Sequence, residues 1–154
     1  MNIAGIDPGK SGGLAVLTSN GIHQSLPMPI IGNDLDGRAI MAWLDDMAPA
    51  LVIVEQVAAM PKQGVTSTFT FGKGYGMILG ILEAKGYAYR LVTPQAWKKS
   101  VLAGTKKDKA AAIAFVHRAY PEIDLTPGKK RMPHDGIADA VCLAEYGRQN
   151  YSCP

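Results

Sequence analysis

Carboxylates close two of the most apolar segments of this sequence. Asp7 ends one such run and is followed at once by a glycine-rich turn, and Glu55 ends another. Asp135 and Asp139 lie one helical turn apart near the C-terminal end. A charge at the end of a buried strand resists desolvation, and several converging carboxylates repel one another unless cations hold them. Oxygen ligands suit Mg²⁺ or Mn²⁺, so these residues predict a divalent-metal site.

Positive charge is concentrated in one segment. The whole chain carries a net charge of +3, but nine Lys or Arg residues and only three acidic residues lie between Lys98 and Arg131. A basic segment beside carboxylates indicates a polyanionic substrate that is cleaved with the help of metal. A solvated helix face is the alternative interpretation of such a run. Within this segment we expect phosphate contacts from Lys106, Lys107, Lys129, Lys130 and Arg131.

Length and composition favour one intracellular domain. The chain has 154 residues, of which 47% are hydrophobic, and we expect one domain over 1–150 with a short tail over 151–154. No apolar run is long enough for a membrane span, and the first residues lack the basic region of a signal peptide, so a cytosolic protein is expected. Two cysteines are too few for a disulfide framework, and Cys142 is predicted to lie in the core.

Hydrophobic periodicity predicts a mixed α/β fold. An antiparallel beginning followed by alternating helix and strand gives a mixed five-stranded sheet with helices on both faces. Thr105 is expected to cap the third helix, and Gly86 is expected to end the second. Segment 27–35 is expected to be a loop, as is 57–66. The predicted strands are 2–7, 13–18, 21–26, 50–55 and 87–92, and the predicted helices are 36–47, 67–85, 105–120 and 134–146.

Three motifs in this order resemble a known family. The segments Ile6-Asp7-Pro8-Gly9, Val54-Glu55-Gln56-Val57 and Asp139-Ala140-Val141 resemble RuvC-type Holliday-junction resolvases, most of all phage-encoded members. The resemblance covers about residues 2–147 and implies an RNase H-like fold. It also implies a homodimeric, Mg²⁺-dependent endonuclease that nicks four-way DNA junctions symmetrically, with two metal ions in each active site.

The resemblance assigns three acidic ligands directly and leaves one open. Asp7, Glu55 and Asp139 match three of the family's four acidic positions. The fourth position usually precedes the final Asp by three residues, where this sequence has Gly136. Asp135 is the predicted substitute, because i+3 and i+4 spacings reach the same helix face. His134 is the alternative, since some relatives use a His in this region.

Further residues are assigned by position within the family. Lys98 and Lys109 fall where relatives carry basic residues that meet the DNA backbone, and Lys109 or His134 is expected to add proton or charge assistance. An aromatic residue is expected to stack on a base at the crossover, and the sequence leaves Phe69 and Phe71 as alternatives. Trp97 is expected to be a packing residue.

Symmetry adds an expectation about assembly. Glycines recur every fourth residue in the helix predicted over 67–85, which predicts a close-packed dimer interface along Gly72, Gly76 and Gly80.

The sequence leaves two other functions open. One is an RNase H-like nuclease that acts on structured RNA. The other is a catalytically silent nucleic-acid-binding module, against which the four acidic residues argue.

Overall fold

A mixed five-stranded sheet forms the centre of the molecule. The computed structural model describes residues 1–58 and 64–151. Strand β1 is central, antiparallel to β2 and parallel to β6, so the predicted mixed sheet is confirmed. In spatial order the strands are β3 (Gln24–Pro27), β2 (Gly13–Leu17), β1 (Ile3–Asp7), β6 (Leu51–Glu55) and β7 (Tyr89–Val92).

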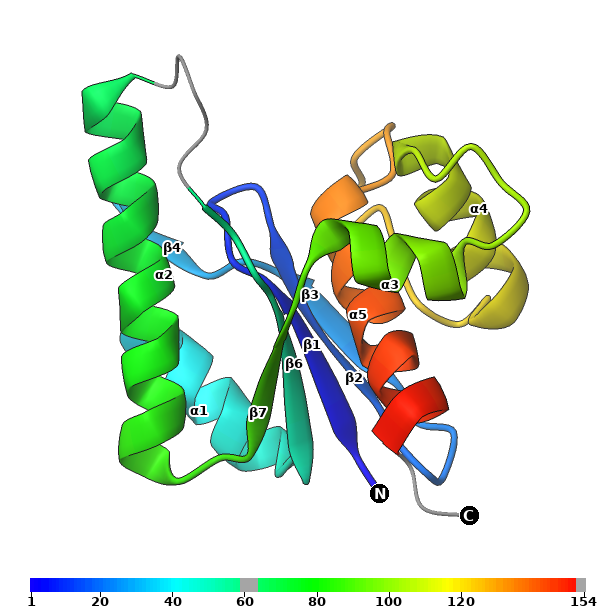
Figure 1. The fold of residues 1–154 in the computed structure, drawn as a ribbon, viewed down its shortest axis with the longest axis horizontal. Helices are drawn as coiled ribbons and strands as arrows, with labels where there is room; N and C mark the ends of the chain where they lie inside the picture. The colour runs from blue at the N-terminus through cyan, green and yellow to red at the C-terminus, as the bar shows by residue number, and fades with distance from the viewer. Residues whose placement is uncertain (59–63, 152–154) are drawn as a thin grey trace.

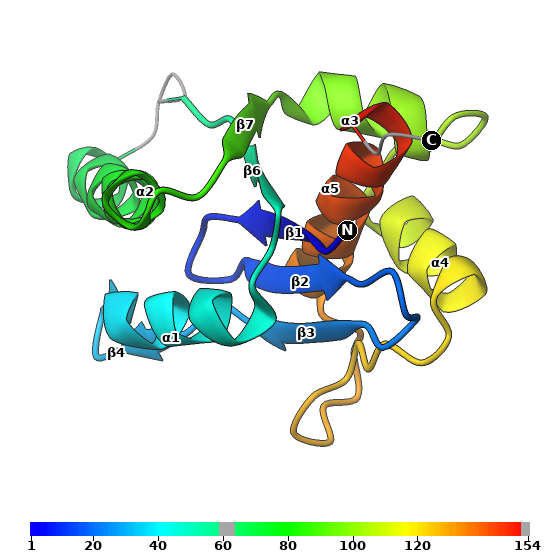
Figure 2. The same cartoon turned by 90° about the horizontal axis from the view of Figure 1, so that it is seen from below.

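Helices cover both faces of the sheet, as the sequence predicts (Figures 1 and 2). Consecutive strand residues point to opposite faces, so β1 contributes Ile3 to one core and Ile6 to the other. Helices α3 (Pro94–Val101), α4 (Lys109–Ala119) and α5 (Asp135–Tyr151) bury the first face, and α1 (Gly37–Met47) and α2 (Val65–Lys85) bury the second.

Helix α5 lies directly on the central strands because glycines leave room for it. A Cβ at Gly5 of β1 would overlap the backbone of Ala140, and a Cβ at Gly13 of β2 would come within 2.9 Å of the backbone of Gly136. Farther along the helix, a Cβ at Gly147 would come within 2.7 Å of a side-chain atom of Ile53. The residues of α5 are therefore held against the sheet by backbone contact at several points.

Capping residues set the ends of the helices. The Asp36 carboxylate accepts a hydrogen bond from the Ala39 N–H at the start of α1, and Gly86 ends α2 with a left-handed φ of 73°, as expected. Helix α4 begins later than predicted, because Asp108 rather than Thr105 is its N-cap. The Thr105 hydroxyl instead donates to the Leu102 carbonyl in the preceding turn.

A hairpin and a helix were not predicted from the sequence. Segment 27–35 was expected to be a loop, but it contains a small hairpin of β4 (Ile30–Ile31) and β5 (Asp34–Leu35). Helix α3 was also missed. Thr93-Pro94 was interpreted as the end of a strand, whereas Thr93 caps the helix and Pro94 occupies its first turn.

Several boundaries differ by a few residues. Strands β3 and β7 begin later than predicted, and α2 begins at Val65 rather than Ser67. The last helix continues to Tyr151, so Tyr151 belongs to α5 and not to a tail. The remainder of the predicted tail, 152–154, lies outside the described residues, as does 59–63 of the predicted 57–66 loop.

Cys142 is buried in the core, as expected. No helix in the described parts of the chain is long and apolar enough to cross a membrane.

Candidate active site

The predicted carboxylates come from three elements that meet at one edge of the sheet. Asp7 is the last residue of β1 and Glu55 the last of β6. These strands are parallel neighbours with Ile6 opposite Val54, so both carboxylates emerge at the same edge. Helix α5 crosses this edge on one face and carries Asp139 (Figure 1).

Asp7 is in an unfavourable environment for a charge. Its pKa is raised to about 7, first by burial and then by the negative charges of Glu55, Asp139 and Asp135, in that order of size. A hydrogen bond from the Gly9 backbone acts in the opposite direction but is outweighed. All four predicted acidic residues therefore lie close enough to act on one another electrostatically.

Asp139 shows the same effect more weakly. Its pKa is raised to about 6, mainly by burial and further by the charges of Glu55 and Asp135. Lys98 and Lys109 lower the pKa of Asp139, with Lys98 the larger of the two. These two basic residues are thus next to the acidic cluster, whereas the other predicted phosphate-binding residues lie in exposed positions around it.

Asp135 is paired with a lysine. Its carboxylate forms an ion pair with the Lys109 ammonium at the first residue of α4, and this contact holds the pKa of Asp135 below its usual value. The pairing joins the N-terminal ends of α4 and α5. The residue before it, His134, caps the start of α5: its Nδ1 accepts the Ile137 N–H at 3.1 Å. Burial and Lys130 lower the pKa of His134.

Gly136 cannot supply the family's missing carboxylate. A Cβ at this position would overlap the backbone of Ser11 and Gly12 in the turn that follows β1. Any side chain would therefore push α5 away from the turn next to Asp7. The glycine at position 136 lets α5 pack closely against this turn, and an acidic side chain there would prevent that packing.

Glu55 has a partner that the sequence analysis did not identify. The Trp97 indole Nε1–H donates to Glu55 Oε1 at 2.8 Å, and the Trp97 ring is fully buried. The packing role expected for Trp97 is confirmed, but packing is only part of its environment. The Thr-Pro pair at 93–94 is the sequence signal that could have revealed α3 and placed Trp97 next to Glu55.

The donor chemistry of this cluster suits a hard divalent cation. Four carboxylates that repel one another would be stabilised by a divalent metal ion, and carboxylate oxygens are the ligands that Mg²⁺ prefers. Over 1–58 and 64–151, no three His, Cys, Asp or Glu side chains are already grouped as ligands of one ion. Two of the four are engaged elsewhere, Glu55 with Trp97 and Asp135 with Lys109.

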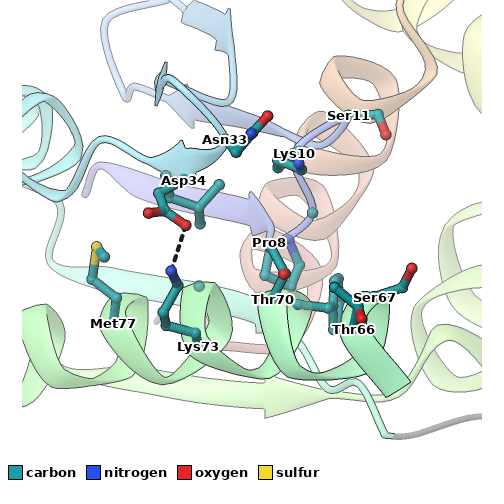
Figure 3. Close-up of a pocket in the computed structure, with 14 residues that line it drawn as sticks. Pro8, Lys10, Ser11, Asn33, Asp34, Thr66, Ser67, Thr70, Lys73 and Met77 are labelled. Atoms are coloured by element: carbon teal, nitrogen blue, oxygen red, sulfur yellow. Dashed lines mark ion pairs between the residues drawn. The ribbon is translucent and has the colours of Figure 1, made fainter. Parts of the chain in front are cut away.

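A cleft of about 530 Å³ with both apolar and polar walls adjoins the acidic cluster on the α2 side (Figure 3). Its walls are the turn after Asp7, the β4–β5 hairpin and the first half of α2. An ion pair of 2.5 Å between Lys73 and Asp34 links the helix to the hairpin across it. The other polar side chains of the lining are Lys10, Ser11, Asn33, Thr66, Ser67 and Thr70.

The two candidate stacking residues differ in exposure. Phe69 is 72% exposed, whereas Phe71 is half-buried. The Phe71 ring lines the cleft beside Asp7 and also a second hollow of about 420 Å³ beside Gln56 and Pro94. Phe69 is therefore free to meet a ligand, and Phe71 separates two hollows at the edge of the site.

Comparison with curated proteins gives one relative. No protein-family model matches the sequence. A crossover junction endodeoxyribonuclease RuvC from Nocardioides sp. is 27% identical over 157 residues, which covers 94% of this chain and 84% of the relative.

Solved structures show the fold. Thermus thermophilus RuvC in complex with a Holliday junction substrate has a TM-score of 0.65 at 19% identity, and covers 97% of this chain and 96% of its own. The yeast mitochondrial Holliday junction resolvase has a TM-score of 0.57 at 14% identity over 94% of this chain and 76% of its own. For the Fowlpox virus resolvase bound to junction DNA the TM-score is 0.53 at 18% identity, over 93% and 95%.

Sheet order and helix placement define an RNase H-like fold with acidic residues at the ends of β1 and β6 and on α5. Within that class, the chain resembles RuvC-type resolvases in both sequence and fold, as its motifs indicate.

Proposed function

We propose that this protein is a crossover junction endodeoxyribonuclease, a Mg²⁺-dependent enzyme that resolves four-way DNA junctions by paired symmetric nicks. The observation that carries the proposal is the convergence of Asp7, Glu55, Asp135 and Asp139 at one sheet edge, in a chain that resembles RuvC. A module that only bound nucleic acid would gain nothing from carboxylates that repel both one another and phosphate.

The four carboxylates are proposed as ligands of two divalent ions, with Mn²⁺ able to replace Mg²⁺. Bound ions of this kind activate water and neutralise charge on the scissile phosphate and the leaving oxygen. The protein's own part is to hold the ligands: β1 and β6 fix Asp7 and Glu55, and α5 fixes Asp135 and Asp139. Lys109 and His134 are proposed to assist with charge or proton transfer.

DNA binding is proposed to extend from this edge over the basic surface and the cleft. Hydroxyl and lysine side chains in the cleft suit the sugar-phosphate backbone of a strand that passes Asp7. Phe69, the more exposed of the two phenylalanines, is the better placed for stacking on an unpaired base. The proposed phosphate-binding residues are Lys98, Lys106, Lys107, Lys109, Lys129, Lys130 and Arg131.

A cleavage assay tests the proposal. Labelled four-way junction, linear duplex of the same sequence and structured RNA are each incubated with the wild-type protein, with and without Mg²⁺. We expect paired nicks in the junction only, and only with Mg²⁺. Asp7→Asn and Glu55→Gln should abolish cleavage while junction binding persists, because the substitutions remove ligands but also remove negative charge.

Each other outcome has a distinct meaning. Cleavage of the RNA alone would identify a nuclease of the same fold with a different substrate. Tight binding without cleavage of any substrate in Mg²⁺ or Mn²⁺ would identify a silent binding module. Near-wild-type turnover by Asp7→Asn or Glu55→Gln would reject the assigned metal ligands.

A further inference from the structure

The Trp97 indole N–H donates its hydrogen bond to a proposed metal ligand. The indole is fully buried in the core between the sheet and α3, α4 and α5, and its Nε1–H donates to Glu55 Oε1 at 2.8 Å. An indole N–H can only donate, so it fixes Oε1 as the acceptor, and among the described residues no hydrogen bond or ion pair to Oε2 is found. A buried indole N–H needs an acceptor, and here the acceptor is the carboxylate at the end of β6.

The backbone holds this pair in a fixed relation. Val92 is the register partner of Glu55 in the β6–β7 ladder, and the Gln56 N–H donates to the Val92 carbonyl at 2.8 Å. Helix α3 begins two residues after Val92, with its first turn capped by the Thr93 hydroxyl, which accepts from the Ala96 N–H at 3.3 Å. Backbone hydrogen bonds between β6 and β7 and the cap of α3 therefore fix the position of Trp97 relative to Glu55.

The next residue of α3 reaches the neighbouring carboxylate. The Lys98 ammonium lies 5.2 Å from the centre of the Trp97 ring, and its charge lowers the pKa of Asp139. Consecutive residues of α3 therefore act on Glu55 by hydrogen bond and on Asp139 by charge. Helix α3 contributes no carboxylate of its own, but it adjoins two of the four.

We propose that Trp97 is a positioning residue for Glu55: its indole N–H holds Oε1 so that Oε2 is presented to a divalent cation. The inference rests on the proposed function of Glu55 as a metal ligand and adds the residue that orients it. Groups that hydrogen-bond to metal ligands fix ligand orientation, and their loss typically weakens metal binding roughly 10–100-fold.

The indole itself provides the first test. The chain contains two tryptophans, Trp43 and Trp97, so a ¹⁵N-labelled protein gives two indole N–H signals in a proton–nitrogen correlation spectrum. Trp43 lies on α1, partly buried against the core of the opposite sheet face, and serves as the internal control. When Mg²⁺ is added to the wild-type protein without DNA, we expect the Trp97 signal to move and the Trp43 signal to stay. Trp43→Phe assigns the two signals.

Substitution provides the second test. Trp97→Phe keeps an aromatic ring in the core but removes the N–H, and Trp43→Phe is the matched control. We expect Trp97→Phe to raise the Mg²⁺ concentration for half-maximal junction cleavage at least about tenfold, with a smaller effect on the rate at saturating Mg²⁺. Trp43→Phe should leave the Mg²⁺ requirement unchanged. In Glu55→Gln, the Trp97 signal should stop responding to Mg²⁺.

Two results would overturn the proposal. One is a Trp97 signal that stays fixed at Mg²⁺ concentrations that saturate cleavage. The other is a folded Trp97→Phe protein with lower thermal stability but an unchanged Mg²⁺ requirement, which would make the residue purely structural. The titration of the wild-type protein decides the question even where Trp97→Phe does not fold. It also separates this inference from the proposed function, because it reports cation binding at Glu55 whether or not junctions are cut.

Discussion

Burial, together with repulsion from the neighbouring carboxylates, makes Asp7 a source of instability in the metal-free protein. Its pKa of about 7 lies above the ordinary value of 3.8, so the folded state favours the protonated carboxyl. The stability from this preference is fully present below about pH 4 and is lost as the pH rises through 7. A buried group that must ionise against three like charges therefore destabilises the fold at neutral and alkaline pH.

Asp7→Asn should accordingly stabilise the metal-free protein at pH 8, by roughly 2–4 kcal/mol, and should have little effect at pH 4. The measurement is denaturant or thermal unfolding in a chelator across this pH range. Mg²⁺ should raise the melting temperature of the wild-type protein at pH 8 but not that of Asp7→Asn. Equal stabilities of the two proteins at pH 8 would show that Asp7 is not ionised against its neighbours.

Substitutions at Asp135 and His134 test which of these two residues supplies the proposed fourth ligand. Asp135→Asn should reduce cleavage far more than His134→Ala, at least about 100-fold against a few-fold, because the carboxylate supplies charge to the metal site. His134→Ala should instead lower the melting temperature, since the imidazole accepts the Ile137 N–H as the cap of α5. The reverse ranking of activities, measured at saturating Mg²⁺, would make His134 the working group.

At the scale of elements, the basic loop before α4 should meet DNA. Lys106 and Lys107 are exposed, and each should contribute one phosphate contact. Substituting either with Ala should reduce the slope of log affinity against log salt by about one. Lys85 is the matched control, because it pairs with Asp45 at the C-terminal end of α2. Slopes that do not change for Lys106→Ala and Lys107→Ala would show that this loop faces away from DNA.

Replacing glycine with alanine should have opposite effects on protein stability in α5 and in α2. Gly147→Ala places a methyl group within 2.7 Å of Ile53 and 2.8 Å of Ile3, so it should destabilise the protein by about 1–3 kcal/mol. Gly72→Ala has open space around it and should stabilise α2 by about 0.5–1 kcal/mol through helix propensity. Unfolding in urea compares the two. A neutral Gly147→Ala would mean that α5 is less tightly seated than the structure indicates.

Elements with strong hydrophobic periodicity could be predicted from the sequence, and short ones could not. All five strands of the main sheet and four of the five helices have clear apolar patterns, and the meeting of Asp7 with Glu55 follows from parallel strands that end at one edge. Helix α3 has only eight residues, and its cap was read as the end of the preceding strand. The contact between Trp97 and Glu55 depends on tertiary packing, which no local pattern contains.

For the whole molecule, symmetry is the main expectation. The Gly72, Gly76 and Gly80 face of α2 has open space around each glycine, and Phe69 is exposed near its start. We expect sedimentation to give about twice the chain mass, and Gly76→Leu to shift it toward one chain, because Leu prevents close approach of two helices. Lys85→Ala, at the C-terminal end of the same helix, is the control. Gly86→Ala is unsuitable because the φ of 73° at Gly86 would strain any side chain. A wild-type protein that stays monomeric with junction bound would reject paired symmetric nicking by a dimer.

The packing of α5 against β1 has a consequence for the order in which the acidic cluster is assembled. Asp7 and Glu55 are made early during synthesis, but Asp135 and Asp139 belong to the last helix, and that helix reaches its place only through backbone contact with Gly5, Gly13 and the turn beside Asp7. A chain still emerging from the ribosome therefore carries half of the acidic cluster and no means of completing it. The proposed active site is therefore complete only after α5 has packed onto β1, so the proposed nuclease activity would arise only in the folded protein.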